Sequence, residues 1–391
     1  MVDVIDVDLD ETADVRTSYE GARRWALLCA GGDVEVLDPR HGQAPDVARG
    51  LLRLRRRARA RDAVGSESSW IAPPARTRPV SVIIPTKHRP LQLARALAAA
   101  RAAMTFGDEL IVVDNGVPPT SSDLAREWGA TFVHEPRRGV AVARNRGAAT
   151  AQRDIVVFLD DDGEADRSCL DVLVAELDAD AEAIAVVGGV LGRDPSSTVG
   201  QLFDARYPLF RGWEGRRFVG STGTTHSPFD IWRVGPGAVM AWRRSSYLEV
   251  GGCDPALGEG TPAGGVEDSD LFRRALDAGW VIRYTPNAVL WHSHPTTRRD
   301  LRRKMNHYAV ASGAHLAKLV LEEGRPTALV YLARQVLWLP GWVRAEVEER
   351  AGRRPHLPVT GIVAFPVMTL LGAVRFVRHR RALRHNHTTT A

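Results

Sequence analysis

Three consecutive carboxylates, Asp160, Asp161 and Asp162, end the apolar run in the segment DIVVFLDDDG. Three like charges at the end of a buried strand would repel one another, and a divalent cation with oxygen ligands relieves that repulsion. Mg²⁺ and Mn²⁺ use few protein carboxylates, because phosphates and water supply their other ligands. The triplet therefore predicts a Mg²⁺ or Mn²⁺ site that also holds a phosphate-containing ligand.

Polar residues also follow two other apolar runs. Pro85, Thr86 and Arg89 lie at or just after the end of PVSVIIPT, whereas Asp114 and Asn115 end the run DELIVVDNG. For Asp114 on its own, a helix cap or turn residue explains the pattern as well as a ligand site does. Because structure alone rarely requires polar residues at every such position, the set as a whole favours ligand binding.

The elements that must position these residues alternate between strand and helix. Continuous apolar runs predict strands that are buried on both faces, and the amphipathic segments between them predict helices. The predicted strands are residues 79–86, 108–116, 131–136 and 154–163, and the predicted helices are residues 89–103, 122–130 and 139–151. This alternation predicts an α/β fold with a mostly parallel sheet, whose ligands bind beyond the carboxyl ends of the strands.

An acidic pair, Glu267 and Asp268, begins the amphipathic segment EDSDLFRRALDAGW, directly after the glycine-rich stretch GEGTPAGGV. Acidic residues in a first helical turn are common for capping reasons alone. A glycine-rich loop can also place a helix start against a bound substrate, where a carboxylate can accept a proton as general base. The residues by themselves leave both interpretations open.

Several classes of protein are excluded by motifs that the sequence lacks. No GxGxxG follows the first predicted strand, and there is no GxxxxGK[ST], which excludes a nicotinamide-dependent Rossmann enzyme and a P-loop nucleoside triphosphatase. The cysteines, Cys29, Cys169 and Cys253, lack the spacing of a zinc site or a disulfide framework and predict a reducing compartment. The first residues lack the order of a signal peptide, which predicts a cytoplasmic protein.

The basic charge of the chain is concentrated near its C-terminal end. The formal net charge is +5, but residues 351–391 contain seven arginines and no carboxylate, so the preceding residues are slightly acidic. The sequence also contains no zinc finger, RNP pattern or basic zipper. The charge therefore does not indicate a nucleic-acid partner.

Several segments match a known family in their order and usual spacing. They are VSVIIPT, IVVDNG, GVAVARNRGAA, FLDDDG, GPGAVMAWRRSSYLEVGGCDPALGEG and EDSDLFRRALDAGW. On these segments, residues 79–300 resemble family 2 glycosyltransferases, which have the Rossmann-like GT-A fold. The resemblance implies inverting transfer of a sugar from a nucleotide-diphosphate donor to an acceptor. His88 and Cys253 depart from the family pattern, in which Asn and Phe are usual at these positions.

The resemblance also implies which residues bind the donor and the metal. Residues of the nucleotide site are Pro85, Thr86, Arg89 and Asp114, with Arg144 and Asn145 of the ARN stretch beside them. The triplet corresponds to the DxD motif of the family, in which Asp162 is the direct metal ligand. Asp160 is a second ligand, and either Asp160 or Asp161 lies nearer the ribose.

For the acceptor side, the resemblance makes Asp268 the catalytic base and Glu267 a neighbour that orients the base or contacts the acceptor. His292 matches a histidine that some family members use as a further metal ligand, and His294 is the alternative. The segment between the DxD motif and the base is rich in aromatic residues. Its tryptophans are expected either to stack on a sugar or to fill the core, and they are Trp213, Trp232 and Trp242.

Three further regions flank this core. Residues 1–63 predict a small α+β module with two strands around a Gly-Gly pair, and residues 64–78 predict a linker. Residues 301–391 predict a helical C-terminal region. Within it, residues 357–374 form an uncharged stretch of 18 residues beside arginines. This stretch has three interpretations: a membrane span, an interfacial helix pair on anionic lipid, or helices packed on the catalytic domain.

The sequence thus predicts a cytoplasmic, metal-dependent inverting glycosyltransferase that is either free in the cytoplasm or bound at the cytoplasmic face of a membrane. Its expected acceptor is a small molecule, a glycan or a lipid-linked sugar. Processive synthases of the family carry QxxRW after the base, whereas Gln335 to Trp338 read QVLW, so single addition is favoured. Two alternatives remain. A sugar-phosphate nucleotidyltransferase would need a GxGTRL-type loop, and a non-catalytic sugar-binding scaffold would tolerate loss of Asp268.

Overall fold

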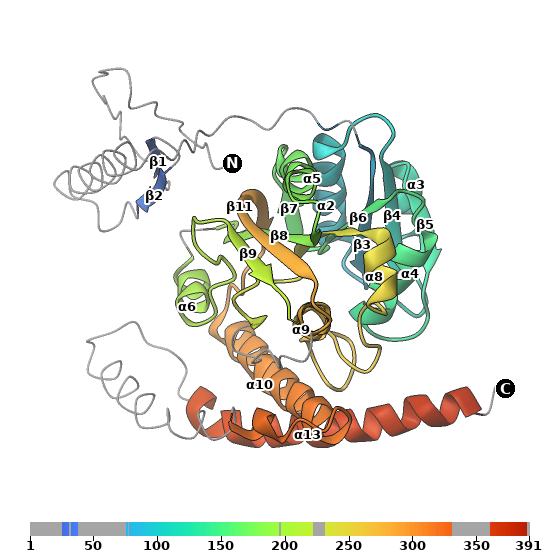
Figure 1. Ribbon diagram of the computed structural model, residues 1–391, viewed down its shortest axis with the longest axis vertical. Coiled ribbons are helices and arrows are strands. Elements are labelled where there is room, and N and C mark those ends of the chain that lie inside the picture. Colours follow the sequence, from blue (N-terminus) through green and yellow to red (C-terminus); the bar gives the residue numbers. More distant parts are fainter. Residues whose placement is uncertain are drawn as a thin grey trace.

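The computed structural model describes two short N-terminal strands, the central part of the chain and one C-terminal helix (Figure 1). The described residues are 26–30, 33–37, 76, 78–194, 197–221, 231–330 and 360–388. The N-terminal strands β1 (Ala26–Ala30) and β2 (Asp33–Leu37) pair antiparallel, as the Gly-Gly pair between them predicted. The rest of the predicted module at 1–63, most of the linker and the QVLW segment lie outside the described residues.

A nine-stranded mixed sheet forms the centre of the molecule (Figure 1), with the order β5-β4-β3-β6-β10-β8-β11-β7 and with β9 paired to β11. Its strands are β3 (Val80–Thr86), β4 (Glu109–Asp114), β5 (Thr131–His134), β6 (Ile155–Leu159), β7 (Gly163–Ala165), β8 (Ala183–Gly192), β9 (Arg216–Val219), β10 (Val239–Arg243) and β11 (Val281–His292). Strands β5, β4, β3 and β6 are mutually parallel, and β11 is parallel to β8. Only β7, β9 and β10 run against the other strands of this sheet.

Helices cover both faces of the sheet, because alternate side chains of a strand point to opposite faces. On one face, Val82 belongs to the same core cluster as Leu97 and Leu173, whereas Ile83 packs on the other face in a cluster with Tyr247 and Phe272. The helices are α2 (Pro90–Ala103), α3 (Ser122–Glu127), α4 (Val140–Thr150), α5 (Cys169–Ala179), α6 (Thr198–Arg206), α8 (Arg244–Glu249) and α9 (Glu267–Asp277). The predicted α/β layers are confirmed.

The strand register brings distant segments of the chain to one edge of the sheet. Thr86 and Asp114 are neighbours at the carboxyl ends of β3 and β4. The antiparallel strand β10 lies beside β6, so the backbone amide of Asp160 donates a hydrogen bond to the carbonyl of Ala238, at 3.0 Å. At the other end of the triplet, His292 of β11 pairs with Gly163, the residue that follows Asp162. The register therefore places the Asp triplet between β10 and the end of β11.

Two long helices, α10 (Arg298–Leu321) and α13 (Thr360–Thr388), pack against each other at the C-terminal end of the described chain (Figure 1). A short 3₁₀ helix, η1 (Pro326–Ala328), follows α10. Glycines allow close backbone contact: a Cβ atom at Gly313 would lie 1.7 Å from the carbonyl oxygen of Thr369. Phe376 is buried in a cluster with Leu257 and Ala314. No helix among the described residues is both long and apolar enough to cross a bilayer. Within residues 357–374, Thr369 and Gly372 pack on α10, whereas Val367, Leu370 and Val374 are exposed.

Candidate active site

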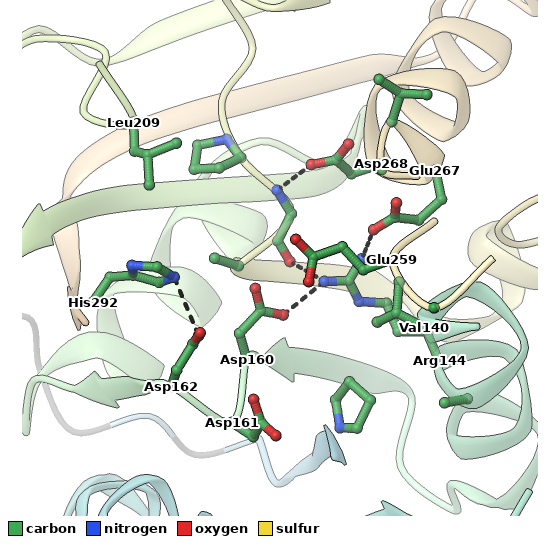
Figure 2. Close-up of a pocket in the computed structure, with 18 of the residues that line it drawn as sticks. Val140, Arg144, Asp160, Asp161, Asp162, Leu209, Glu259, Glu267, Asp268 and His292 are labelled. Carbon is green, nitrogen blue, oxygen red and sulfur yellow. Dashed lines mark hydrogen bonds and ion pairs between the residues drawn. The ribbon is translucent and has the colours of Figure 1, made fainter. Parts of the chain in front are cut away.

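A cleft at the carboxyl edge of the sheet brings together most of the residues that the sequence singled out (Figure 2). Its lining includes ten of them: Pro85, Thr86, Arg89, Arg144, Asp160, Asp161, Asp162, Glu267, Asp268 and His292. They come from the end of β3 and the loop after it, from the loop after β6, from α4, from the start of α9 and from the end of β11. Segments about 200 residues apart in sequence thus share one cavity.

Asp160, Asp162 and His292 form a group whose ligand atoms all lie within 4.8 Å of one another. The Nε2 atom of His292 is 3.1 Å from Oδ1 of Asp162 (Figure 2). Two carboxylates and an imidazole suit Mn²⁺, which accepts both oxygen and nitrogen ligands. Among the described residues this is the one group with the composition and spacing of a cation site.

The electrostatics of the Asp triplet differ from one carboxylate to the next. Burial raises the pKa of Asp160, although the nearby Arg144 opposes this effect. Burial also raises the pKa of Asp161, to about 6. Asp162 is buried as well, but the adjacent His292 and Arg89 hold the pKa of its carboxyl well below the usual range. Asp162 is therefore the member of the triplet that is ionised most readily.

Asp161 is directed towards the end of β3. The hydroxyl of Thr86 donates a hydrogen bond to its Oδ2 at 2.7 Å, and Nη1 of Arg89 lies 3.0 Å from its Oδ1. The same guanidinium nitrogen is 3.1 Å from Oδ2 of Asp162. Arg89 thus offsets two charges of the triplet while its side chain remains 42% exposed, so it can also reach a ligand in the cleft.

Arg144 connects the two acidic groups of the cleft (Figure 2). Its Nη1 donates to Oε1 of Glu267 at 2.7 Å, and its Nη2 donates to Oδ1 of Asp160 at 2.8 Å and to the carbonyl of Gly237 at 3.0 Å. The side chain is 3% exposed. Although burial disfavours the cation, the two carboxylates raise the pKa of Arg144 further above its usual value. One guanidinium therefore fixes the metal-binding side relative to the start of α9.

The acidic pair at the start of α9 consists of two carboxylates in different environments. Burial and the neighbouring Asp268 raise the pKa of Glu267 to about 7, against the effect of Arg144. Asp268 accepts hydrogen bonds from the backbone amides of Gly237, at 2.7 Å, and Ser269, at 2.6 Å. Asp268 is half-buried, lines the cleft and forms no ion pair among the described residues.

The residue before the pair has unusual backbone geometry. Val266 adopts φ 71° and ψ 9°, a left-handed conformation that costs energy for a β-branched residue. Just upstream, a Cβ atom at Gly258 would lie 3.2 Å from Oε2 of Glu267 and 3.0 Å from a methyl group of Val140. The glycine-rich loop is therefore tightly fitted around the acidic pair, and its geometry sets where α9 begins.

Asp114 and Asn145, two residues predicted for the nucleotide site, do not line this cleft. Asp114 accepts hydrogen bonds from the hydroxyl of Ser121 and from the amides of Gly116, Thr120 and Ser121. Although burial opposes them, these bonds lower its pKa, and the Ser121 hydroxyl contributes most. The carboxylate thus holds the loop after β4.

The amide of Asn145 holds a different turn. Its Nδ2 donates to the carbonyl of Cys253 at 2.8 Å, and its Oδ1 accepts from the amide of Cys253 at 2.8 Å and from the hydroxyl of Tyr247 at 2.7 Å. A Cβ atom at Gly252 would lie 2.5 Å from this Oδ1. Asn145 therefore holds the turn at Cys253 and does not line the cleft.

His294, the alternative to His292, does not line the cleft. Its Nδ1 lies 3.2 Å from Nδ1 of His292, and its Nε2 lies 2.8 Å from Oδ1 of Asp204 on α6. This arrangement resembles the chain of imidazole and carboxylate that orients metal-binding histidines. His294 is thus placed to position His292.

The sequence did not single out several residues that line the cleft, among them Glu259, Lys304 and Tyr308. Nζ of Lys304 lies 2.7 Å from Oε1 of Glu259, and this ion pair lowers the pKa of Glu259, although burial opposes it. Lys304 and Tyr308 belong to α10, beyond residue 300. Their signal in the sequence was weak, because a lysine and a tyrosine four residues apart are ordinary on any amphipathic helix.

The three tryptophans have different environments. Trp242 is fully buried and stacks on Phe272, with ring centroids 6.1 Å apart. Trp213 packs against Phe210, with centroids 4.4 Å apart. Trp232 lines the cleft. Of the two interpretations, core filling thus applies to Trp242, whereas Trp232 is placed where it can contact a ligand.

Residues 81–247 match the family described as Glycosyl transferase family 2. They form a glycosyl transferase family 2 domain. The match includes the Asp triplet, and it ends before α9, which carries the acidic pair. The remainder of the cleft, from the glycine-rich loop to α10, thus lies outside the matched segment.

The glycosyl transferase family 2 domain has several relatives. The chain is 29% identical over 327 residues to the pre-mycofactocin glycosyltransferase of Mycobacterium tuberculosis, covering 80% of this chain and 64% of that relative. The chain thus spans less than two thirds of the relative's length. It is also 26% identical over 242 residues to the probable glycosyltransferase YdaM of Bacillus subtilis, covering 59% of this chain and 54% of the relative.

A solved structure supports the fold. The mannosyltransferase PcManGT from Pyrobaculum calidifontis, in complex with GDP-Man and Mn²⁺, superposes with a TM-score of 0.50 at 20% sequence identity. The match covers 82% of this chain and 92% of that chain. The predicted GT-A type fold is confirmed on this basis.

Proposed function

We propose that this protein is a metal-dependent glycosyltransferase that moves a sugar from a nucleotide-diphosphate donor to an acceptor, with inversion at the anomeric carbon. The observation that carries the proposal is the shared cleft, in which the Asp160–Asp162–His292 group and the acidic pair of α9 are joined by Arg144. The family 2 domain and the relatives named as glycosyltransferases support the reaction class.

The ligand atoms of the Asp160–Asp162–His292 group fit a divalent cation. Asp162, Asp160 and His292 would hold Mn²⁺ or Mg²⁺, and the bound cation supplies charge stabilisation for the diphosphate that leaves with the nucleotide. Arg89 lies beside Asp161 and Asp162, with an exposed side chain that can contribute to the same charge stabilisation. The structural relative bound to GDP-Man and Mn²⁺ supports a donor of this kind, with GDP-Man as one candidate.

Asp268 is the general base of this proposal. Inverting substitution requires a carboxylate on the acceptor side to accept the proton of the attacking hydroxyl. The amides of Gly237 and Ser269 orient Asp268. Glu267 is tied to Arg144 and shielded from solvent, which suits a positioning role. The proton would pass from the acceptor hydroxyl to Asp268 as the new glycosidic bond forms and the bond to the leaving phosphate breaks.

The first test is a panel of nucleotide-diphosphate sugars, scored for release of nucleotide diphosphate with and without Mn²⁺. Asp162→Ala should abolish metal-dependent binding of the nucleotide diphosphate, because the cation would lose its most readily ionised ligand. Isothermal calorimetry measures this binding directly. Asp178→Asn is the matched control, since Asp178 is an exposed carboxylate that pairs with Arg78 on the surface. Unchanged metal-dependent affinity in Asp162→Ala would contradict the proposed metal site.

We also propose a peripheral contact with the cytoplasmic face of an anionic membrane. Val367, Leu370 and Val374 are exposed and lie three and four residues apart, so they share one face of α13. Arg375 and Arg378, close by in sequence, are exposed as well. An apolar face with nearby arginines fits an interface rich in anionic lipid.

Vesicles test this contact. The protein should sediment with vesicles that contain phosphatidylserine and should not sediment with neutral vesicles. Leu370→Ser should weaken the association, whereas Leu248→Ser, at an exposed leucine on α8, should not. Equal recovery of the Leu370 variant and the wild type would contradict the membrane contact.

A further inference from the structure

Arg211 lines the cleft in the segment between α6 and β9. Within the described part of the chain, its guanidinium donates one hydrogen bond, from Nη1 to the carbonyl of Pro208, whereas its Nε is buried without a partner. No carboxylate among the described residues forms an ion pair with it. Burial without such a partner lowers the pKa of Arg211 to about 10. Arg211 is half-buried, and withdrawing a cation from water without a pairing anion costs free energy that an anionic ligand could recover.

Arg144 and Lys304 also line the cleft, and they differ from Arg211 in their ion pairs, although Nε of Arg144 is likewise buried without a hydrogen-bond partner. Arg144 is paired with Asp160 and Glu267, and Lys304 is paired with Glu259. Their charges are therefore already balanced by the protein. Arg89 likewise pairs with Asp161 and Asp162. Among the described residues, this contrast makes Arg211 the half-buried cation of the cleft that has no carboxylate partner and can accept an anion from outside.

Aromatic side chains surround Arg211. Its Cζ atom lies 5.1 Å from the ring centroid of Trp232, and the ring of Trp232 meets that of Tyr308 edge to face, with centroids 6.1 Å apart. Both aromatic residues line the cleft. The carboxylate of Asp268 is close enough to Arg211 and Tyr308 to act on their pKa values, and it raises the pKa of each, although burial lowers the pKa of Arg211 overall. The aromatic and cationic groups are thus on the side of the proposed base.

We propose that Arg211, Trp232 and Tyr308 form an acceptor subsite that binds a phosphate or carboxylate group carried by the acceptor. This inference rests on the proposed function, because it assigns the acceptor to the side of Asp268. Arg211 would hold the anionic group through charge-assisted hydrogen bonds, and the aromatic rings would contact the apolar or ring portion next to it. The acceptor class is therefore an anionic hydroxyl compound, with the anion on either a soluble ring compound or a lipid phosphate.

Calorimetry with simple anions tests the subsite. The protein is first saturated with Mn²⁺ and with the nucleotide diphosphate that the donor panel selects, so that the metal and the donor phosphate site are filled. Phenyl phosphate, geranyl phosphate and the neutral compound phenol are then titrated into wild type, Arg211→Gln and Arg217→Gln. Arg217 is the matched control, because it is an arginine of β9 whose partners are Asp180 and Glu182.

Arg211→Gln should weaken binding of at least one phosphate compound about tenfold or more, because a charge-assisted hydrogen bond is lost. Arg217→Gln should bind it like wild type, and phenol should not distinguish the variants. Tighter binding of phenyl phosphate would identify a soluble ring acceptor, and tighter binding of geranyl phosphate a lipid phosphate. Equal phosphate binding by Arg211→Gln and wild type, with both proteins folded by circular dichroism, would overturn the subsite.

Donor chemistry is measured separately. Release of nucleotide diphosphate by the wild type tests the proposed function without any anionic acceptor. If this release occurs and the phosphate compounds do not bind, only the acceptor subsite is wrong. If Arg211→Lys restores phosphate binding that Arg211→Gln loses, the charge rather than the packing of the side chain is responsible.

Discussion

Helix α9 contains two buried carboxylates, Asp270 and Glu267, less than one turn apart. Their pKa values are shifted in opposite directions. Asp270 contacts Lys318 at 2.7 Å, Arg274 at 2.8 Å and Arg273 at 3.1 Å. Despite its burial, these cations hold the pKa of Asp270 far below the usual range. Glu267 pairs with one cation among the described residues, Arg144, and burial raises its pKa to about 7.

The difference between the ion pairs of Asp270 and Glu267 shows that one helix can serve both structure and chemistry. The charge of Asp270 is fully paired, and Lys318 also contacts Asp254 at 2.7 Å, which in turn pairs with Arg380 of α13. This network ties α9 to α10 and α13. The carboxylates at the start of the same helix have fewer cations and face the cleft. Incomplete charge pairing, rather than burial, therefore distinguishes the candidate site from the supporting network.

The largest expected effect is that of substituting Asp268, which forms no ion pair among the described residues. Asp268→Asn should lower turnover by roughly 10²–10⁴-fold, because an amide of similar volume cannot accept the acceptor's proton. Affinity for the nucleotide diphosphate should stay near that of wild type, since the metal group is unchanged. Steady-state kinetics and calorimetry measure the two quantities separately.

Glu267→Gln is the internal comparison for this experiment and should reduce turnover less than Asp268→Asn. A larger loss in Glu267→Gln would mean that the roles of the two residues are reversed. Near wild-type turnover in Asp268→Asn would show that the base is elsewhere in the cleft.

The second effect concerns stability. Asp270→Asn should destabilise the fold by about 3–5 kcal/mol, because the buried Lys318 would lose one of its two carboxylate partners. Urea denaturation followed by circular dichroism measures the free energy of unfolding. Turnover per folded molecule should change far less than in Asp268→Asn. A variant with wild-type stability and greatly reduced turnover would reverse the proposed division between network and site.

The smallest expected effect is a difference in how the free energy of unfolding depends on pH. The folded-state pKa of Glu267, about 7, lies above its unfolded value of about 4.3, so the native state binds the extra proton between these values. Its contribution to stability is present below the unfolded pKa and is lost as the pH rises to about 7. Asp270 has the opposite sign, since its depressed pKa makes its contribution disappear as the pH falls below about 4.

Glu267→Gln should therefore flatten the decline of the unfolding free energy between pH 5 and 7. Urea titrations of wild type and variant in EDTA, at steps of half a pH unit, measure this slope. Asp268→Asn serves as the comparison because it changes the adjacent carboxylate. Parallel curves for wild type and Glu267→Gln would show that the proton of Glu267 is not linked to folding.

The sequence predicted the parts of the fold that depend on local pattern. The strands that end at Thr86, Asp114 and Leu159 were evident because each is a continuous apolar run followed by polar residues. Parallel neighbours necessarily bring those ends to one edge of a sheet. The antiparallel insertion of β10 between β6 and β8 did not follow from alternation, because its apolar pattern does not encode strand direction.

The cleft could be predicted only in part, for a related reason. The Asp triplet and the acidic pair have a signal in residue type. The state of Arg211 instead depends on the fold, which gives it no ion-pair partner among the described carboxylates. Asp114 and Asn145 show the reverse case. Their residue types fit a ligand site, but backbone amides and carbonyls engage their polar atoms in the described structure. Hydrogen-bond partners that are distant in sequence decide these roles.

The bridging position of Arg144 has a thermodynamic consequence. Its single charge is divided between Asp160 and Glu267, so any ligand that neutralises Asp160 leaves more of the guanidinium's attraction for Glu267. Occupancy at the Asp triplet would then favour release of a proton from Glu267. By reciprocity, raising the pH across the titration of Glu267 would strengthen occupancy at the triplet by the same free energy. Binding of a cation at the triplet and release of a proton from Glu267 would then be thermodynamically linked.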